Sequence, residues 1–533
     1  MRGELVGTGA LVRLILRRDR LVLPAWLVPV GLLPVGVTSS LAGVVPTEAA
    51  RTQMARTMGT NTGFVALYGE LRGSSIEAIA GWRLGFVPVV VAVIGLLMVI
   101  RHTRADEEVG RRDLLGSTVV GRHAPLAAAL LATVAAMLAL AGLVALGLIA
   151  TGAPAAGSWA LGAQFAAGGI AFAAVGAVAA QLTEGAGSAR GIALSVLGAA
   201  FLLRSAGDVA GGGLSWLSWL SPLGWVVRLH PYGGDRWWVL GPILAFAVVL
   251  AALAAVLSAR RDVGGGLFAT RLGPAAAAAG LRTPVALAWR LQRGLVLGWV
   301  IGLAAIGLVF GAVAESVGDI VRDNPILAQA LERFGGRARL VDTFLATVMG
   351  LVGLIAAGYA IQATLRLRYE ETTGRAEPLL ATAVGRVGWA ASHLVFAALG
   401  PAMALAAAGL ATGVVHGLNT GQVGREVPRT VGAALVQLPA VWVLAAFAVA
   451  LYGLLPRAVP LTWGLLGGCL LLSLLGPLLR LNQSTMDLSP FTHVPRLPGA
   501  ALTPTPLVWL AAAAAALALV GLAGLRRRDF PLG

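Results

Sequence analysis

The sequence predicts an all-α membrane protein with about twelve transmembrane helices, arranged as two parallel repeats of six helices. Only 12% of the 533 residues are charged and 58% are hydrophobic, whereas about a quarter of the residues in a soluble domain are charged. Apolar runs of about 20 residues recur along the chain, and each is long enough to cross a bilayer core of about 30 Å as a helix. An internal duplication is the third observation, and it predicts the two repeats.

The duplication is clearest in a charged stretch, residues 104–122, which returns as residues 368–386 at a constant shift of 264 residues. We call these stretches the first and second charged loops. The identical pairs are Arg104/Arg368, Glu107/Glu371, Gly110/Gly374, Arg111/Arg375, Leu115/Leu379, Thr118/Thr382, Val120/Val384, Gly121/Gly385 and Arg122/Arg386. The pairs that keep a negative charge are Asp106/Glu370 and Asp113/Glu377.

Shorter motifs also recur, and they follow the same order in both halves. They are Ser221-Pro222 with Ser489-Pro490, Arg228 with Arg496, and Arg260-Arg-Asp262 with Arg527-Arg-Asp529. Repeats that keep the same order are parallel and are related by an axis along the membrane normal.

The apolar runs define the expected spans. In the first repeat these are about 21–44, 84–100, 125–151, 157–183, 190–207 and 238–258. In the second they are about 294–314, 343–365, 389–414, 432–455, 461–480 and 507–525. The chain therefore divides into a first half over residues 1–258, a cytoplasmic connector with a surface helix over 259–290, and a second half over 291–533.

The distribution of arginine predicts the orientation. With a cytoplasmic N-terminus, 25 of the 40 basic residues, all of them arginine, belong to the cytoplasmic segments, as the positive-inside rule requires. We therefore expect a multi-pass protein of the plasma membrane with both termini in the cytoplasm.

Residues 1–20 are basic and amphipathic. Leu11, Leu14 and Ile15 fall on a different helical face from Arg13 and Arg17, which predicts a helix on the inner membrane surface. The arginines could also act only as a topology signal, and the two interpretations are compatible. We expect a second surface segment at Ala288–Arg293.

Each charged loop is predicted to contain a short cytoplasmic helix, at 111–121 and 375–385. Gly110 opens the first segment, and Gly121 followed by Arg122 fits a helix C-terminus. The loop could simply be anchored at the interface, or it could dock a cytoplasmic subunit. The charges persist in both copies while the surrounding residues differ, which favours docking. The acidic residues could pair with Arg104 and Arg368 or hold the docking helix at a fixed angle.

Several kinds of site are excluded by composition. The chain has no lysine, so it cannot form a P-loop, whose lysine contacts the phosphates of ATP. Cys469 is the single cysteine, which excludes a disulfide framework and a Cys-based metal site. No metal-binding or hydrolytic motif is present, and the positive charge is spread over loops, so nucleic acid is not an expected partner.

In these motifs the sequence resembles the membrane subunits of ABC-2-type exporters, in particular the two-half permeases of actinobacterial drug and antibiotic export systems. The residues that carry the resemblance are Glu107-Glu-Val-Gly-Arg111 and its second copy, Leu220-Ser-Pro-Leu-Gly-Trp225, Pro231-Tyr-Gly-Gly-Asp-Arg-Trp-Trp238 and Arg260-Arg-Asp262. The resemblance implies an amphipathic elbow before the first span, a coupling helix after the second, and a re-entrant segment between the fifth and sixth. It also implies a small hydrophobic or amphiphilic substrate, two copies of a separate ATPase subunit, and ATP and Mg²⁺ bound there and not by this chain.

The resemblance assigns two sets of site residues. Those that would couple to the ATPase subunit are Asp106, Glu107, Glu108, Gly110, Arg111, Asp113, Leu115, Glu370, Glu371, Gly374, Arg375, Glu377 and Leu379. Those of the outer gate are Ser221, Pro222, Trp225, Arg228, Ser489, Pro490 and Arg496. The second half has no clear counterpart of Pro231–Trp238, so we expect two unequal gates. Substrate contacts cannot be assigned from sequence.

The alternative is a proton-coupled multidrug carrier of the major facilitator type. Such carriers also have two parallel six-helix halves, and Glu107–Arg112 imitates their charged loop. However, a proton-coupled carrier needs a buried carboxylate as a relay, and the expected spans contain no Asp or Glu away from their ends. The loop also continues to a second Gly-Arg pair, Gly121-Arg122. The sequence therefore favours an ATP-driven exporter.

Overall fold

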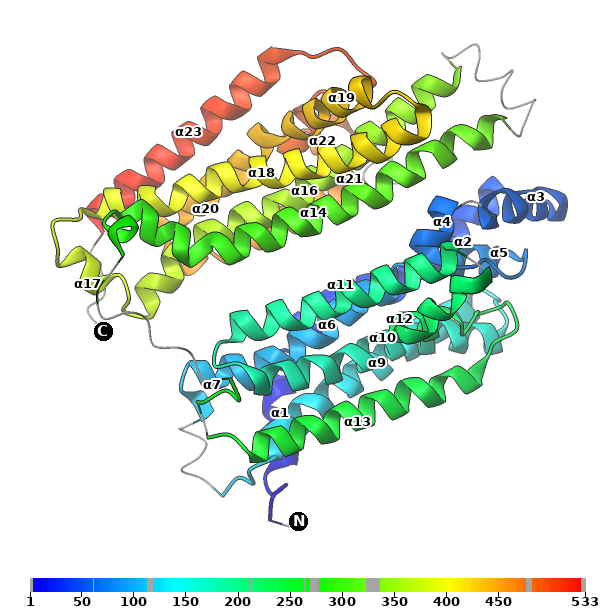
Figure 1. Ribbon diagram of the computed structural model, residues 1–533, viewed down its shortest axis with the longest axis horizontal. Helices are drawn as coiled ribbons and strands as arrows, with labels where there is room; N and C mark the ends of the chain where they lie inside the picture. Colours follow the sequence, from blue (N-terminus) through cyan, green and yellow to red (C-terminus); the bar gives the residue numbers. More distant parts are fainter. Residues whose placement is uncertain are drawn as a thin grey trace. The chain divides into compact units, whose positions relative to one another are not determined.

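The computed structural model describes residues 3–60, 62–112, 119–210, 212–262, 264–268, 276, 278–322, 336–475 and 482–528. Within these ranges, eleven helices are long and apolar enough to cross a membrane, and a further apolar helix, Leu461–Ser473, is shorter. The chain divides into two compact units, Met1–Gly273 and Pro274–Gly533 (Figure 1). The prediction of an all-α, multi-span membrane protein is confirmed.

The first unit is built from one surface helix and six candidate spans. The helices are α1 (Thr8–Arg18), α2 (Val22–Val44), α6 (Val87–Ile100), α9 (Ala124–Ala150), α10 (Ala155–Leu182), α11 (Ala186–Ala210) and α13 (Leu240–Ala259). Short segments at the end away from α1 are α3 (Glu48–Gly59), α4 (Thr62–Tyr68), α5 (Ile76–Arg83), η2 (Gly212–Leu220), α12 (Pro222–Val227) and η3 (Trp237–Val239).

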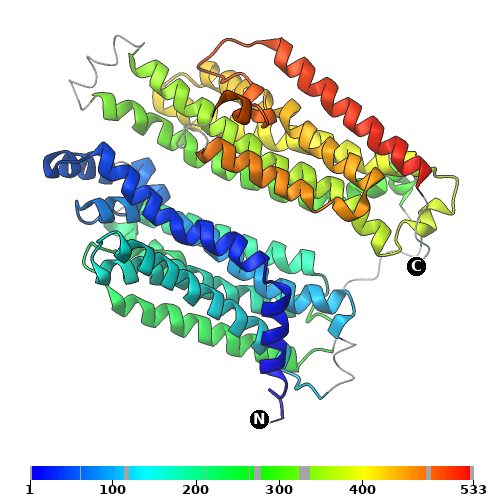
Figure 2. The same cartoon turned by 180° about the vertical axis from the view of Figure 1, so that it is seen from behind.

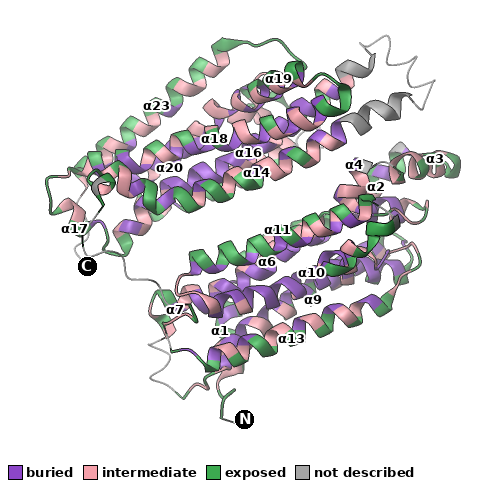
Figure 3. Cartoon of the chain, in the orientation of Figure 1, coloured by how far each residue is buried: buried purple, intermediate pink, exposed green. Residues whose placement is uncertain are grey.

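Helix α10 is the centre of the first unit, and α6, α9, α11 and α13 pack around it (Figure 3). Glycines let the backbones approach closely. A Cβ added to Gly95 of α6 would lie 2.4 Å from the carbonyl oxygen of Gly169, and one added to Gly162 would lie 2.4 Å from that of Ala141. Small residues at helix contacts are a common basis of helix association in membranes, where burial of apolar surface drives little.

Helix α1 has the amphipathic character predicted for residues 1–20. Leu11 and Ile15 are buried against the start of α9, while Arg13 and Arg17 are exposed. Leu14 is half-exposed, at 51%. Figure 2 shows α1 turning away from the direction of α2.

The second unit consists of the following helices. They are α14 (Pro284–Arg322), α16 (Gly336–Thr372), α17 (Glu377–Leu380), α18 (Arg386–Thr420), α19 (Val423–Leu435), α20 (Leu438–Leu454), η5 (Pro456–Ala458), α21 (Leu461–Leu475), α22 (Gln483–Met486), η6 (Pro490–His493) and α23 (Pro504–Arg527). Helix α18 packs against α14, α16 and α19, and α20 packs against α16 and α23.

The surface segment predicted at Ala288–Arg293 does not form a helix of its own in the described part of the chain, because it lies inside α14. Helix α14 runs without a break from Pro284 to Arg322. In the first unit, α1 ends at Arg18 and α2 begins at Val22, and Pro24 has no N–H to donate to the carbonyl of Arg20, which weakens a helix at that point. No proline follows Pro284 within α14, and the helix continues into the span.

A predicted boundary was also wrong at α19 and α20, which form one candidate span, Val423–Leu454. It begins nine residues before the predicted start at 432. Glu426 is buried within it because Arg429 lies 2.9 Å away, and Arg429 also binds Asp342 of α16 at 2.8 Å. These charges compensate one another, so the helix can continue through a polar stretch.

Candidate functional site

The first charged loop begins at the end of α6. A π-helical turn, Arg101–Ala105, follows α6 and leads into the short helix α7, Asp106–Glu108. Gly110 then has a φ of 73°, and Gly374 has a φ of 70° at the same place in the second loop. Glycine adopts this left-handed conformation without strain and commonly ends helices in it. Gly110 therefore ends the preceding helix, whereas the sequence predicted that it opens the next one.

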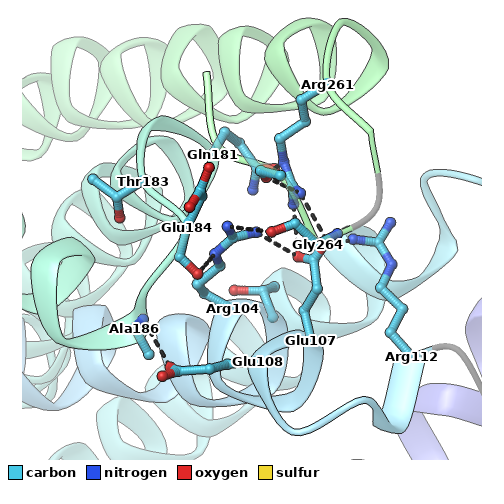
Figure 4. A network of polar contacts seen from close by, with 12 residues as sticks. Arg104, Glu107, Glu108, Arg112, Gln181, Thr183, Glu184, Ala186, Arg261 and Gly264 are labelled. Carbon is cyan, nitrogen blue, oxygen red and sulfur yellow. Dashed lines mark hydrogen bonds and ion pairs between the residues drawn. The ribbon is translucent and has the colours of Figure 1, made fainter. Parts of the chain in front are cut away.

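Glu107 is the centre of a buried ion-pair cluster (Figure 4). Its side chain is only 2% exposed. Its carboxylate oxygens accept hydrogen bonds from Arg261 Nη1 at 2.7 Å and Nη2 at 2.8 Å, and from the backbone N–H of Gly264 at 2.7 Å. Arg104 and Arg112 approach it at 3.1 and 3.3 Å. We call these five residues the Glu107 cluster. A buried carboxylate is tolerated only with such pairing and hydrogen bonding.

The Glu107 cluster joins the ends of four helices. Arg104 Nε donates to the carbonyl of Glu184, between α10 and α11, at 2.8 Å. Arg261, which follows α13, donates from Nε to the side chain of Gln181 on α10 at 2.9 Å. The backbone N–H of Ala186 at the start of α11 donates to Glu108 at 3.0 Å, and a carboxylate at a helix N-terminus is stabilising. The loop after the second span is thus fixed to the end of the sixth.

The second unit contains a corresponding cluster. Arg528, directly after α23, donates to the two carboxylate oxygens of Glu371 at 2.8 and 2.6 Å. The hydroxyl of Tyr452 donates to the same carboxylate. We call Glu371, Arg528 and Tyr452 the Glu371 cluster. The neighbouring Glu370 pairs with Arg366 at 2.6 Å.

The arginines that close the loops make a second matched contact. Arg122 donates to the carbonyls of Ala259 and Arg261 at 2.7 and 3.1 Å. Arg386 donates to the carbonyl of Arg528 at 2.7 Å. The last carbonyls of a helix have no partner within it, so cations near them are favourable. In both units, therefore, one arginine after the last span binds the loop twice, through its side chain and through its carbonyl.

The predicted coupling residues divide by exposure. Those that are buried or have buried side chains are Glu107, Glu370 and Glu371. Those that are half-buried are Asp106, Gly110 and Leu379, and those that are exposed are Glu108, Arg111, Gly374, Arg375 and Glu377. Asp113 and Leu115 lie outside the described residues, as does most of the helix predicted at 111–121.

The helix predicted at 375–385 is shorter than expected. Helix α17 covers only Glu377–Leu380, with Pro378 in its first turn. Leu379 packs against buried residues of its own unit, including Trp389. The charged residues Arg375 and Glu377 are exposed, whereas Leu379 is half-buried within its own unit.

Sequence reasoning did not identify Arg261 and Arg528 as partners of the loop carboxylates. The available signal was the recurrence of Arg261-Asp262 as Arg528-Asp529, each at a similar distance in sequence from its glutamate. The recurrence was recognised as part of the repeat, but it does not by itself show which residues touch.

The outer-gate candidates of the first unit form a compact structure at the opposite end from the charged loop. Ser221 accepts from the backbone N–H of Leu223 at 3.2 Å and donates to the carbonyl of Ala200 at 2.6 Å, so it starts α12 with Pro222 in the first turn. Leu223 and Val226 are buried. Helix α12 contacts both α10 and α11, so it is folded into the unit.

Arg228 and Trp225 hold this structure to the preceding turn. Arg228 donates to the hydroxyl of Ser218 at 2.6 Å and lies over the ring of Trp219. Trp225 donates from its indole N–H to the carbonyl of Trp219 at 2.7 Å.

The second outer-gate segment is different. Ser489 precedes the single turn η6, Pro490–His493, in which no residue is buried. Arg496 is exposed, unlike its aligned partner Arg228. The expected inequality of the two segments is therefore visible in their local structure.

The structure also shows what the Pro231–Trp238 motif, which has no clear counterpart in the second unit, contacts in the first. The Tyr232 hydroxyl is 2.8 Å from that of Ser158 at the start of α10, and a Cβ on Gly157 would lie 2.1 Å from the tyrosine ring. The pKa of His230 is lowered to about 4, mainly because the ring is buried and also because Arg72 is nearby. The His230 side chain is therefore neutral near pH 7.

The chain is similar to a known transport protein over nearly its whole length. It is 47% identical over 525 residues to the multidrug efflux system permease protein Rv1217c of Mycobacterium tuberculosis (strain ATCC 25618 / H37Rv), and the alignment covers 98% of this chain and 95% of that protein. Residues 281–526 match the family model described as multidrug efflux system permease Rv1217c, C-terminal domain. The similarity therefore includes both units.

Proposed function

The chain belongs to the family of multidrug efflux system permeases, and we propose that it is the membrane-spanning permease subunit of an ATP-driven exporter. Its substrates would be hydrophobic or amphiphilic compounds, such as drugs, antibiotics or lipid-like molecules, moved out across the plasma membrane. ATP and Mg²⁺ would be bound by a separate ATPase subunit in two copies, because a chain without lysine has no P-loop.

The observation that best supports this proposal is the matched attachment of the two charged loops. In each unit a buried glutamate of the loop binds the arginine that follows the last span. A force applied to the loop would therefore act on the second and the last spans together. The exposed Arg111, Arg375 and Glu377 are the loop residues that a docked subunit would meet.

An even number of candidate spans, six, separates the two loops in the described chain. If all of them cross the membrane, both loops face the same compartment. Two copies of one ATPase subunit could then bind them in the same way, and ATP-driven closure would displace one unit against the other. Substrate would be exposed alternately to the two sides, as in other transporters with internal repeats.

The test compares energy sources for export. Cells that express the chain with its partner should stop exporting a fluorescent hydrophobic dye when ATP is depleted, even if a proton gradient is imposed. The purified chain should carry a P-loop ATPase subunit. Export that survives ATP depletion and stops with a protonophore would overturn the proposal in favour of the proton-coupled carrier.

A further inference from the structure

A cavity of about 350 Å³ lies at the charged-loop end of the first unit, next to helix α1. One side is apolar and includes Leu11, Leu14 and Ile15 of α1 and Leu126 of α9. The volume is within the range of small-molecule sites. It is large enough for a phosphorylated headgroup and the first part of an acyl chain.

The other side of the cavity is cationic. Arg18, Arg111, Arg112 and Arg261 line it, together with the single carboxylate of Asp106. Asp106 is shared between Arg18 at 2.8 Å and Arg111 at 2.6 Å. The other two arginines share Glu107. Among the described residues, the four lining guanidinium groups are thus paired with only Asp106 and Glu107, and Arg104 also pairs with Glu107, so positive charge is in excess.

Two further features bear on the ligand: the first favours negative charge, and the second favours a hydroxyl group. Burial lowers the pKa of Arg112, although Glu107 opposes the effect, so the negative charge present does not fully compensate this arginine. His102 also lines the cavity, with Nε2 2.6 Å from Asp19, and its buried Nδ1 has no hydrogen-bond partner within the described residues. In a neutral ring this nitrogen can accept a hydrogen bond from a ligand hydroxyl.

The position of the cavity favours a lipid over a soluble anion. Helix α1 is a basic amphipathic helix, the type that lies in the membrane interface, and it continues into α2, whose surface is largely exposed and apolar. With α1 in the interface, the lining arginines would be at the level of lipid headgroups, and the lining leucines would meet the adjoining acyl chains. Basic pockets at the cytoplasmic ends of transmembrane helices commonly bind anionic headgroups.

We propose that this cavity binds the headgroup of an anionic phospholipid, which links helix α1 to the first charged loop. Among the described residues of the second unit, the segment before the first span is part of the continuous helix α14, and Glu370 pairs with Arg366 of its own helix. The site therefore belongs to the first unit. It does not depend on the energy source of transport.

The experiment measures lipid binding to the purified full-length chain by native mass spectrometry and by thermal unfolding in detergent. Phosphatidylglycerol should bind and raise the unfolding temperature, whereas phosphatidylcholine should not. The variant R18Q/R111Q should weaken phosphatidylglycerol binding about tenfold or more, since each basic residue near anionic lipid contributes about fivefold. R13Q/R17Q removes the same charge from the exposed face of α1 and should retain binding.

A second variant tests the apolar side without changing any charge. L14Q should also weaken phosphatidylglycerol binding, because Leu14 is half-exposed and lines the cavity. Equal binding of the two lipids to the unmodified chain, or equal loss in R18Q/R111Q and R13Q/R17Q, would overturn the proposal. So would protection by millimolar inorganic phosphate equal to that by the lipid, because the site would then be a simple anion site.

Discussion

Glu107 and Glu371 lie in the interior of their units, although each belongs to a run of polar residues in the sequence. Their placement changes how a substitution there would act. Reversing either charge would be the direct test of the coupling role that the resemblance implies for these two residues. With three arginines around Glu107, such a variant would also disturb the fold, so coupling is better tested at the exposed arginines.

The substitution Glu107→Gln should destabilise the protein strongly. Breaking a buried ion pair by removing one partner costs about 3–5 kcal/mol, because the other charge stays buried without compensation. Glu371→Gln should cost less, since Arg528 is 18% exposed. Thermal unfolding in detergent, followed by size-exclusion chromatography, measures both.

Glu377→Gln is the matched control, because Glu377 is exposed, and it should unfold like the unmodified chain. The double variant E107Q/R261Q should lose less stability than the sum of its single variants, as expected for partners in contact. Strict additivity would show that the pair does not interact.

The residue types of both clusters could be read from the sequence, but their pairing could not. Glu107 and Arg261 are 154 residues apart, and Glu371 and Arg528 are 157 apart. Helical periodicity relates residues within a few turns, whereas these contacts depend on how whole helices pack. The conformation of the two loop glycines is easier to predict from the sequence than these pairings. A helix that ends in a left-handed residue, as at Gly110 and Gly374, is a local feature that a glycine in each repeat can indicate.

At the scale of helices, hydropathy located the spans well where they are uniformly apolar. The spans predicted at 21–44 and 125–151 correspond to Val22–Val44 and Ala124–Ala150. It failed where a helix continues into polar sequence, as at the start of α14 and of α19. Charged residues there lower the hydropathy without ending the helix, because the backbone hydrogen bonds that hold a helix together do not depend on the polarity of its side chains.

Close helix contacts make a further prediction. Gly95→Ala should lower the unfolding temperature, because its Cβ would lie 2.4 Å from the carbonyl oxygen of Gly169 and the two helices would have to separate. Gly142→Ala is the control, since nothing lies within 4 Å of its added Cβ. It should be neutral or slightly stabilising, as alanine is the better helix former. Equal effects of the two substitutions would contradict the packing of α6 on α10.

At the scale of the molecule, the duplication predicts two like halves, and the chain divides into two compact units. Their described residues include six candidate spans in the first unit, and five with one shorter apolar helix in the second. The missing counterpart of Pro231–Trp238 indicated that the outer segments differ, but the alignment did not show which contacts change. Arg228 packs on Ser218 and Trp219, whereas Arg496 is exposed. Aligned residues can thus have different neighbours when the surrounding segments have diverged.

The proposed exporter needs both charged loops, which leads to a prediction about single variants. If two ATPase subunits close together, R111E or R375E alone should remove more than half of ATP-dependent export, and the double variant should approach background. Folding should persist because Arg111 is exposed and its ion pair with Asp106 lies near the surface, where an ion pair contributes about 1 kcal/mol or less.

The control is R13E, which reverses an exposed charge outside both loops and should retain export. Dye export and ATP hydrolysis of the co-purified complex are the two measurements. Normal values of both in the double variant would remove these arginines from the coupling role.

The π-helical turn at Arg101–Ala105 has a consequence for comparing the two repeats. A π turn takes in about one more residue than an α turn, which delays the rotation of the chain about the helix axis by roughly 100°. Helix α16 has no such turn over its aligned residues. The two repeats therefore align without a gap, but their aligned residues point in different directions around the helix axis. Arg104 is fully buried and its identical partner Arg368 only half-buried, so an effect measured at one position does not transfer to the other by alignment alone.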